Sequence, residues 1–233
     1  GDDLKDYNFN EDIFKNNNIE IKYFPDLDFG EKWMKINNTI KNQFRRKVWA
    51  KKFQFHKFYL FHQYFKKWEY ILYIDCGMNI YSNIQPILDE KKEGVLFANR
   101  DGVDNETKYG GLPLFHQFLK NDKIKEQNEI FTKLKNNYNL YTLSFQTTLL
   151  LFNTNLIKKN TMNELIALNK EYPISRNNDQ GIIGLYFYKK WKQLKRKNDK
   201  IYFYDFVKCV NEPYIMTKKT IGRYKHIGYL NDN

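Results

Sequence analysis

The sequence has little of several residue types, and each shortage argues against a class of protein. It has only two cysteines, Cys76 and Cys209, among 233 residues. That count argues against a disulfide framework and makes a reducing, cytoplasmic compartment the expectation. No apolar run approaches the roughly 20 residues that span a bilayer, and the polar opening GDDLKDYNFNED is unlike a secretory signal. We therefore expect one domain over residues 1–233, large enough for a proper core.

Acidic residues are also in the minority, with 27 Asp and Glu against 39 Lys and Arg, which gives a net charge of +12. Such a charge fits nucleic acid, an anionic membrane surface or a phosphorylated substrate. However, Lys and Asn are abundant along the whole chain, as in the composition that an A- and T-rich genome imposes. The aromatic residues, 18% of the chain, lie in apolar runs typical of a core. A nucleic-acid-binding module needs exposed aromatics on one basic sheet face, so no nucleic acid is expected and this hypothesis ranks last.

Three common catalytic motifs are missing as well. There is no Gly-rich phosphate loop, no Cys and His cluster with zinc spacing, and no Gly-x-Ser-x-Gly elbow. Their absence argues against the common nucleotide-binding loops, zinc sites and serine hydrolases of those types.

The stretch from Trp68 to Leu88 is the most informative part of what is present. Its apolar run, Tyr70–Ile74, predicts a strand buried on both faces and ends at Asp75. Open α/β sheets bind ligands at the carboxyl ends of their strands, which favours Asp75 as a ligand-binding carboxylate. The following Cys76-Gly77 pair leaves room for close approach to the backbone. The alternative is that Asp75 caps a turn.

Alternating strand and helix patterns predict an α/β fold with a mixed, mostly parallel central sheet flanked by helices. The predicted strands are 19–24, 70–74, 78–81, 94–98, 144–152 and 201–206. The predicted helices are 11–15, 31–40, 43–67, 114–136, 161–170 and 181–191, with a loop over 103–113. In the helix over 161–170, Thr161 is the expected cap and Glu164 takes the capping-box position.

The order of four segments resembles nucleotide-sugar-dependent glycosyltransferases of the GT-A fold, closest to the family-8, glycogenin-like type. The segments are LYIDCGMNIYSNIQPI, FQTTLLLFNTNLI, NNDQGIIGLYF and KHIGYL, and the resemblance covers roughly residues 44–229. The first resembles the strand with the Asp-x-Asp motif, and the third resembles the "DQ" helix start. The last resembles the His-x-x-Gly segment, with one residue fewer between His226 and Gly228. The family's first, base-binding strand has no counterpart before Ile19, so it is missing or atypical here.

The resemblance implies a donor site for a UDP-sugar. It assigns Asp75 to the donor sugar or ribose and, with His226, to a divalent metal on the diphosphate, Mn²⁺ or Mg²⁺. Gly77 stands where the family has its second carboxylate, which puts the metal in doubt. Cys76 is either a soft ligand or a residue packed into the sheet. Lys57 falls near a donor-contacting lysine, and its alternative is an ordinary solvated lysine.

The resemblance also places Asp179 and Gln180 beside the anomeric carbon, where they stabilise the transition state by charge or by nucleophilic attack. Asp179 equally fits a helix N-cap. The implied function is the retaining, metal-assisted transfer of a hexose from a UDP-sugar to the hydroxyl of a glycan, protein or small-molecule acceptor. Gly77 motivates a second hypothesis, a protein that binds a nucleotide sugar without turnover.

Overall fold

The computed structural model describes residues 17–44, 52–75, 78–80, 84–101, 111–194, 196–197, 200–201 and 207–209. Its central feature is an open four-stranded sheet in the order β1-β4-β3-β5. The strands are β1 (Tyr70–Ile74), β3 (Leu96–Arg100), β4 (Phe145–Asn153) and β5 (Trp191–Gln193). β4 runs antiparallel to both β1 and β3, whereas β3 and β5 are parallel. The α/β class and the mixed sheet are confirmed, but the sheet is only partly parallel.

Successive side chains of a strand point to opposite faces of the sheet, so alternate residues pack into two separate hydrophobic cores. In β4, Leu150 and Phe152 belong to the larger core, while Leu149 and Leu151 belong to the smaller one. β1 lies at an end of the strand order, which explains why all five of its residues are only half-buried. The prediction that this strand is buried on both faces is therefore wrong.

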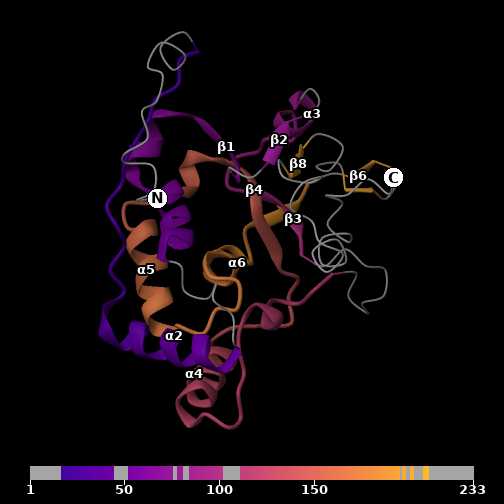
Figure 1. The fold of residues 1–233 in the computed structure, drawn as a ribbon. Helices are drawn as coiled ribbons and strands as arrows, with labels where there is room; N and C mark the ends of the chain where they lie inside the picture. Colours follow the sequence, from indigo (N-terminus) through magenta and orange to yellow (C-terminus); the bar gives the residue numbers. More distant parts are fainter. Residues whose placement is uncertain are drawn as a thin grey trace.

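Helices cover the larger core, and α6 packs directly on β4 (Figure 1). This layer contains α2 (Gly30–Phe44), α5 (Thr161–Glu171), α6 (Asp179–Phe187) and the 3₁₀ helix η2 (Lys52–Phe61). The short helix α3 (Gln85–Leu88) contributes Ile87, 1% exposed, to the smaller core. None of the helices in the described part of the chain is both long and apolar enough to cross a membrane.

The helical region predicted over 43–67 exists but is built differently. Residues 45–51 of this region lie outside the described residues, and from residue 52 it consists of η2 and a second 3₁₀ helix, η3 (Gln63–Lys67). The side chains of Phe55, Phe58 and Phe61 are all at most 2% exposed, and their spacing is three residues. Because side chains three residues apart align in a 3₁₀ helix, this spacing places all three phenyl rings in the core.

The apolar–polar alternation of 19–24 does not form a strand. Residues 19–29 have no regular secondary structure and run along the outside of the molecule to α2 (Figure 1). The predicted helix over 114–136 is split into η4 (Leu114–Gln117) and α4 (Lys125–Asn137). The predicted helix over 181–191 begins earlier and ends at Phe187, since Trp191 opens β5.

Two short pairs of strands complete the described structure. β2 (Met78–Ile80) pairs with β8 (Val207–Cys209), and β6 (Arg196–Lys197) pairs with β7 (Lys200–Ile201). The predicted helix over 11–15 and most of the predicted segments over 103–113 and 201–206 lie outside the described residues. At α5 the cap is Asn160 rather than Thr161, whose hydroxyl accepts a hydrogen bond from the amide of Lys158.

Candidate functional site

Three strand ends meet at one edge of the sheet and bring the predicted site residues together. Asp75 follows β1, Asp101 follows β3, and Thr147 lies near the start of β4. Because β4 is antiparallel to its neighbours, its first residues lie beside the last residues of β1 and β3. The amide of Asp75 donates to the carbonyl of Thr148 (2.9 Å), and the amide of Asp101 donates to that of Ser144 (2.9 Å).

Lys57 joins two of the predicted residues through its ammonium group. Its Nζ lies 2.9 Å from Oδ1 of Asp75 and 3.5 Å from Oδ2 of Asp179. The same Nζ donates to the carbonyl and hydroxyl oxygens of Thr147, each at 3.3 Å. The side chain of Lys57 is only 16% exposed, so the prediction of a solvated lysine is wrong.

Asp179 is the first residue of the helix α6, and its side chain is almost fully buried. Oδ2 accepts a hydrogen bond from Thr147 Oγ1 (2.7 Å), and the side chain is 7% exposed. The cap of α6 is Asn178, which has a positive φ of 51° and makes no side-chain cap. The N-cap alternative for Asp179 is therefore wrong, and the unusual φ at Asn178 is local strain at the start of this helix.

Burial and neighbouring charges shift the pKa values of Asp179 and Lys57 in opposite directions. Burial raises the pKa of Asp179 above its ordinary value, against the opposing effects of Lys57 and the Thr147 hydrogen bond. Burial also acts to lower the pKa of Lys57, but Asp179 and Asp75 outweigh it and the pKa is raised. At neutral pH Lys57 is therefore a fixed cation between two carboxyl groups.

Gln180 belongs to a second cluster that sequence reasoning missed. Its Nε2 donates to Oδ2 of Asp101 (3.2 Å) and to Oε1 of Gln117 (3.1 Å). Gln117 also donates to Asp101, and Gln146 donates to Oδ1 of Asp101 (3.4 Å). Asp101 thus accepts hydrogen bonds from three amide groups. Asp179 and Gln180 are adjacent residues at the start of α6, so the two clusters adjoin there and together make the polar site.

The missed carboxylate had a signal in the sequence. Asp101 directly follows β3, as Asp75 follows β1, although the apolar run of β3 ends at Ala98 and the polar residues Asn99 and Arg100 come between. A carboxylate at the end of a predicted strand was the reason for selecting Asp75, and the same reason applies to Asp101. Gln117 had no comparable signal, because it lies in a short 3₁₀ helix far along the chain from the other site residues.

Cys76, Gly77, His226 and Gly228 lie outside the described residues. Of the two predicted metal ligands, Asp75 alone is described, and its Oδ1 already accepts from Lys57 and from the hydroxyl of Tyr73 (2.6 Å). Among the described residues, no group of three or more His, Cys, Asp or Glu side chains has the arrangement of a metal site. The described side chains by themselves therefore do not fit a divalent cation.

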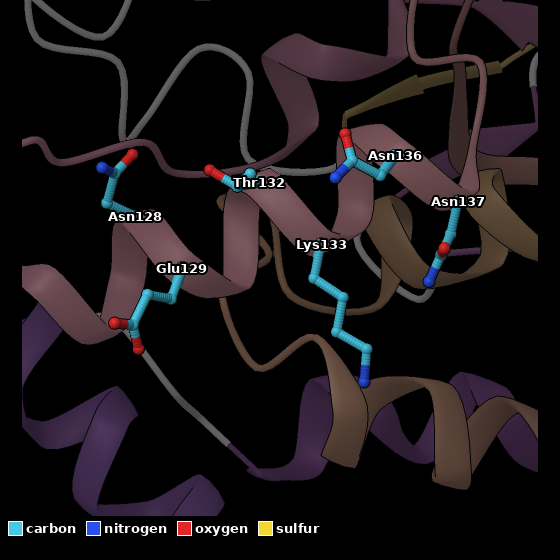
Figure 2. A pocket seen from close by; sticks show the side chains of 6 residues that line it. All are labelled: Asn128, Glu129, Thr132, Lys133, Asn136 and Asn137. Atoms are coloured by element: carbon cyan, nitrogen blue, oxygen red, sulfur yellow. The ribbon is translucent and has the colours of Figure 1, made fainter.

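Two surface hollows lie elsewhere. One, of about 460 Å³, is lined by α4 alone, and its Lys133 extends toward α5 (Figure 2), where it pairs with Glu171 at 2.9 Å. The other, of about 430 Å³, includes Gly94 before β3 and Asn155 after β4, at the opposite edge of the sheet from Asp75. Neither contains a residue of the polar site, so we assign neither to the predicted chemistry.

Comparison of the chain with models of known protein families gave no match, and comparison with curated proteins gave none.

Proposed function

We propose that the chain is a glycosyltransferase that moves a hexose from a UDP-sugar to an acceptor hydroxyl. The observation that supports this proposal is that the carboxylates of Asp75 and Asp179 both lie within 3.5 Å of the Lys57 ammonium group. These residues come from a 3₁₀ helix, a strand end and a helix start. The resemblance in sequence assigns all three to one donor site.

The second cluster supports the same proposal. A hexose presents several hydroxyl groups that each donate and accept hydrogen bonds. Asp101 accepts, and the amides of Gln117, Gln146 and Gln180 both donate and accept. Side chains held by each other at fixed positions bind a polyhydroxyl ligand with little loss of rotamer entropy. In our proposal this cluster binds the sugar, and Asp179 lies between the cluster and Lys57.

The proposed reaction breaks the bond between the anomeric carbon and the diphosphate oxygen, and forms a bond to the acceptor oxygen. Lys57 supplies positive charge near the leaving diphosphate, and the carboxylate of Asp179 stabilises positive charge at the anomeric carbon. The acceptor proton leaves with the diphosphate. Whether Asp179 also attacks the anomeric carbon is the difference between the covalent and front-face routes to retention.

No step in this scheme depends on a metal ion. A bound Mn²⁺ or Mg²⁺ would neutralise the diphosphate, and its predicted ligands are Asp75 and His226. Because Lys57 already neutralises Asp75, a metal must compete with an ammonium group at 2.9 Å.

The test is a thermal-shift panel of nucleotide sugars, each with Mn²⁺ and with EDTA. A donor at one hundred times its Kd stabilises the folded state by about 2.7 kcal/mol, or roughly 5–11 °C for a chain of this size. Asp75→Ala should abolish the shift. The matched control is Asp122→Ala, whose side chain is 71% exposed and pairs with Lys120. A shift that survives Asp75→Ala unchanged would place donor binding elsewhere.

A second measurement separates the enzyme from a protein that binds without turnover. The release of UDP from the stabilising donor is followed with and without candidate acceptors. Stabilisation without UDP release under any condition would contradict the transferase proposal and favour nucleotide-sugar binding alone. Stabilisation in EDTA equal to that in Mn²⁺ would show that donor binding needs no divalent metal.

A further inference from the structure

The segment 19–24, Ile-Glu-Ile-Lys-Tyr-Phe, presents its apolar side chains to solvent. Glu20 pairs with Lys67 of η3 (2.6 Å), Lys22 Nζ lies 5.0 Å from the ring centre of Tyr64, and Phe24 stacks on Tyr59 at 4.4 Å. The intervening residues are exposed: Ile19 by 48%, Ile21 by 39% and Tyr23 by 57%. The alternation that predicted a half-buried strand is therefore present, but its apolar side chains face solvent, and the side chain of Glu20 between them is 53% exposed as well.

The backbone of this segment is also available for pairing. Within the described residues, none of the backbone groups of 19–24 takes part in a backbone hydrogen bond. The segment is bounded by Asn18, with φ 53°, and by Pro25, whose carbonyl accepts from Tyr59 (2.8 Å). It runs along the outside of the molecule (Figure 1). An alternating segment with unpaired backbone groups and exposed apolar side chains is a template for pairing with another strand.

The segment is complementary to itself. In an antiparallel pair centred on Ile21, Ile21 faces Ile21 of the second copy, and Ile19 faces Tyr23. The same register places Glu20 opposite Lys22, twice by symmetry. Opposite charges and apolar residues directly across from each other stabilise an antiparallel pair. A symmetric pair of this kind is the ordinary geometry of a two-fold dimer.

We propose that residues 19–24 pair antiparallel with the same segment of a second copy of this chain, in the register centred on Ile21. The body of each copy holds its own segment in place through Glu20, Lys22 and Phe24, so little chain entropy is lost on pairing. The six apolar side chains then lie side by side on one face of a two-stranded ribbon. Other occupants of this surface are an extended segment of another protein or a part of this chain that the structure does not describe.

The first test is charge reversal, followed by sedimentation velocity over a concentration series. The wild-type mass should rise from 28.4 kDa toward twice that value. Lys22→Glu places Glu opposite Glu20, and Glu20→Lys places Lys opposite Lys22, so each variant alone should dimerise at least about tenfold more weakly. In an equimolar mixture the two variants face each other with opposite charges, and the dimer should return.

The mixture also controls for damage within each copy, because Glu20→Lys loses its own pair with Lys67. A wild-type chain that stays monomeric at every concentration would overturn the proposal. That result would favour another protein, or another part of this chain, as the binding partner of this surface. A mixture that fails to recover the dimer, when both variants unfold at wild-type temperature, would overturn it too.

The second test fixes the register by disulfide cross-linking in a background with Cys76→Ser and Cys209→Ser. Ile21→Cys should cross-link with itself, since the two Cα atoms across an antiparallel pair lie at about 4.5–5.5 Å. Ile19→Cys and Tyr23→Cys should each stay uncross-linked alone and should cross-link when mixed. Self-cross-linking of Ile19→Cys, or none with Ile21→Cys, would contradict this register.

Discussion

Replacing Lys57 by methionine removes the ammonium from the polar site and leaves two carboxylates without their shared cation. At 3.5 Å the Lys57–Asp179 pair has a gross attraction of about 5 kcal/mol at an effective dielectric constant of about 20. Part of this attraction offsets the cost of burying the lysine. Measured losses when one partner of a buried pair is removed are about 3–5 kcal/mol.

We expect a loss near 3 kcal/mol for Lys57→Met, because Lys57 is 16% exposed and its second partner, Asp75, is 34% exposed. For a chain of this size that corresponds to a fall in Tm of about 6–12 °C. The measurement is thermal unfolding at pH 7, followed by circular dichroism. The matched control is Lys125→Met, whose side chain is 92% exposed, and which should change stability by about 0.5 kcal/mol or less.

The dependence on pH provides an independent check. Burial raises the pKa of Asp179, so the folded state binds this proton more tightly than the unfolded state does. A raised pKa contributes stability that is complete below the ordinary value of 3.8 and is lost as the pH rises through the folded value. Without Lys57 the folded value rises further, so the deficit of Lys57→Met should shrink as the pH falls from 7 toward 4.

A double variant, Lys57→Met with Asp179→Asn, tests whether the stability lost in Lys57→Met comes from the unpaired charge of Asp179. It removes both members of the buried pair, so most of the lost stability should return. If the double variant is as unstable as Lys57→Met, or if Lys57→Met behaves like Lys125→Met, the electrostatic account of this site is wrong.

Further predictions concern α6 and the second cluster. Gly181→Ala should destabilise the fold by about 1–3 kcal/mol in urea unfolding, because its Cβ would lie 2.4 Å from Ser175 Oγ and 3.1 Å from the carbonyl of Gln117. Gly184→Ala is its control and should be close to neutral, since its Cβ meets only the end of the Leu114 side chain at 3.2 Å. Gln117→Leu removes one hydrogen-bond partner from Gln180 and one from Asp101, and should lower the stabilisation by a donor in the thermal-shift assay more than Gly184→Ala does.

The main strands, and the positions of Asp75, Asp179 and Gln180 at the ends of elements, were predictable because their signals are local. An apolar run that ends at a carboxylate predicted β1 and Asp75, and the start of α6 placed Asp179 and Gln180 at a helix terminus. The segment 19–24 was not predictable in this way. Its alternation is the same whether the apolar face or the polar face packs inward, and contacts with Tyr59, Tyr64 and Lys67 decide the outcome.

The prediction of one continuous helix over 43–67 was wrong for a different reason. Its lack of Gly and Pro favours any helix, whereas the three-residue spacing of Phe55, Phe58 and Phe61 distinguishes a 3₁₀ helix from an α-helix. Local sequence patterns could not predict the interactions of Lys57 either. Its partners Asp75, Thr147 and Asp179 come later in the chain, and Thr147 is 90 positions after Lys57. Only the antiparallel direction of β4 brings them to one sheet edge.

The contacts of Lys57 have a consequence for the order in which the molecule opens. One ammonium group holds η2, the end of β1, the start of β4 and the start of α6 at the same point. None of these segments can leave that point without breaking interactions with the others. Slow hydrogen exchange at the Asp75 amide, which donates to the carbonyl of Thr148, should therefore require opening of the whole core rather than fraying of the strand end. The candidate site and the proposed cooperative folding unit therefore share the same residues.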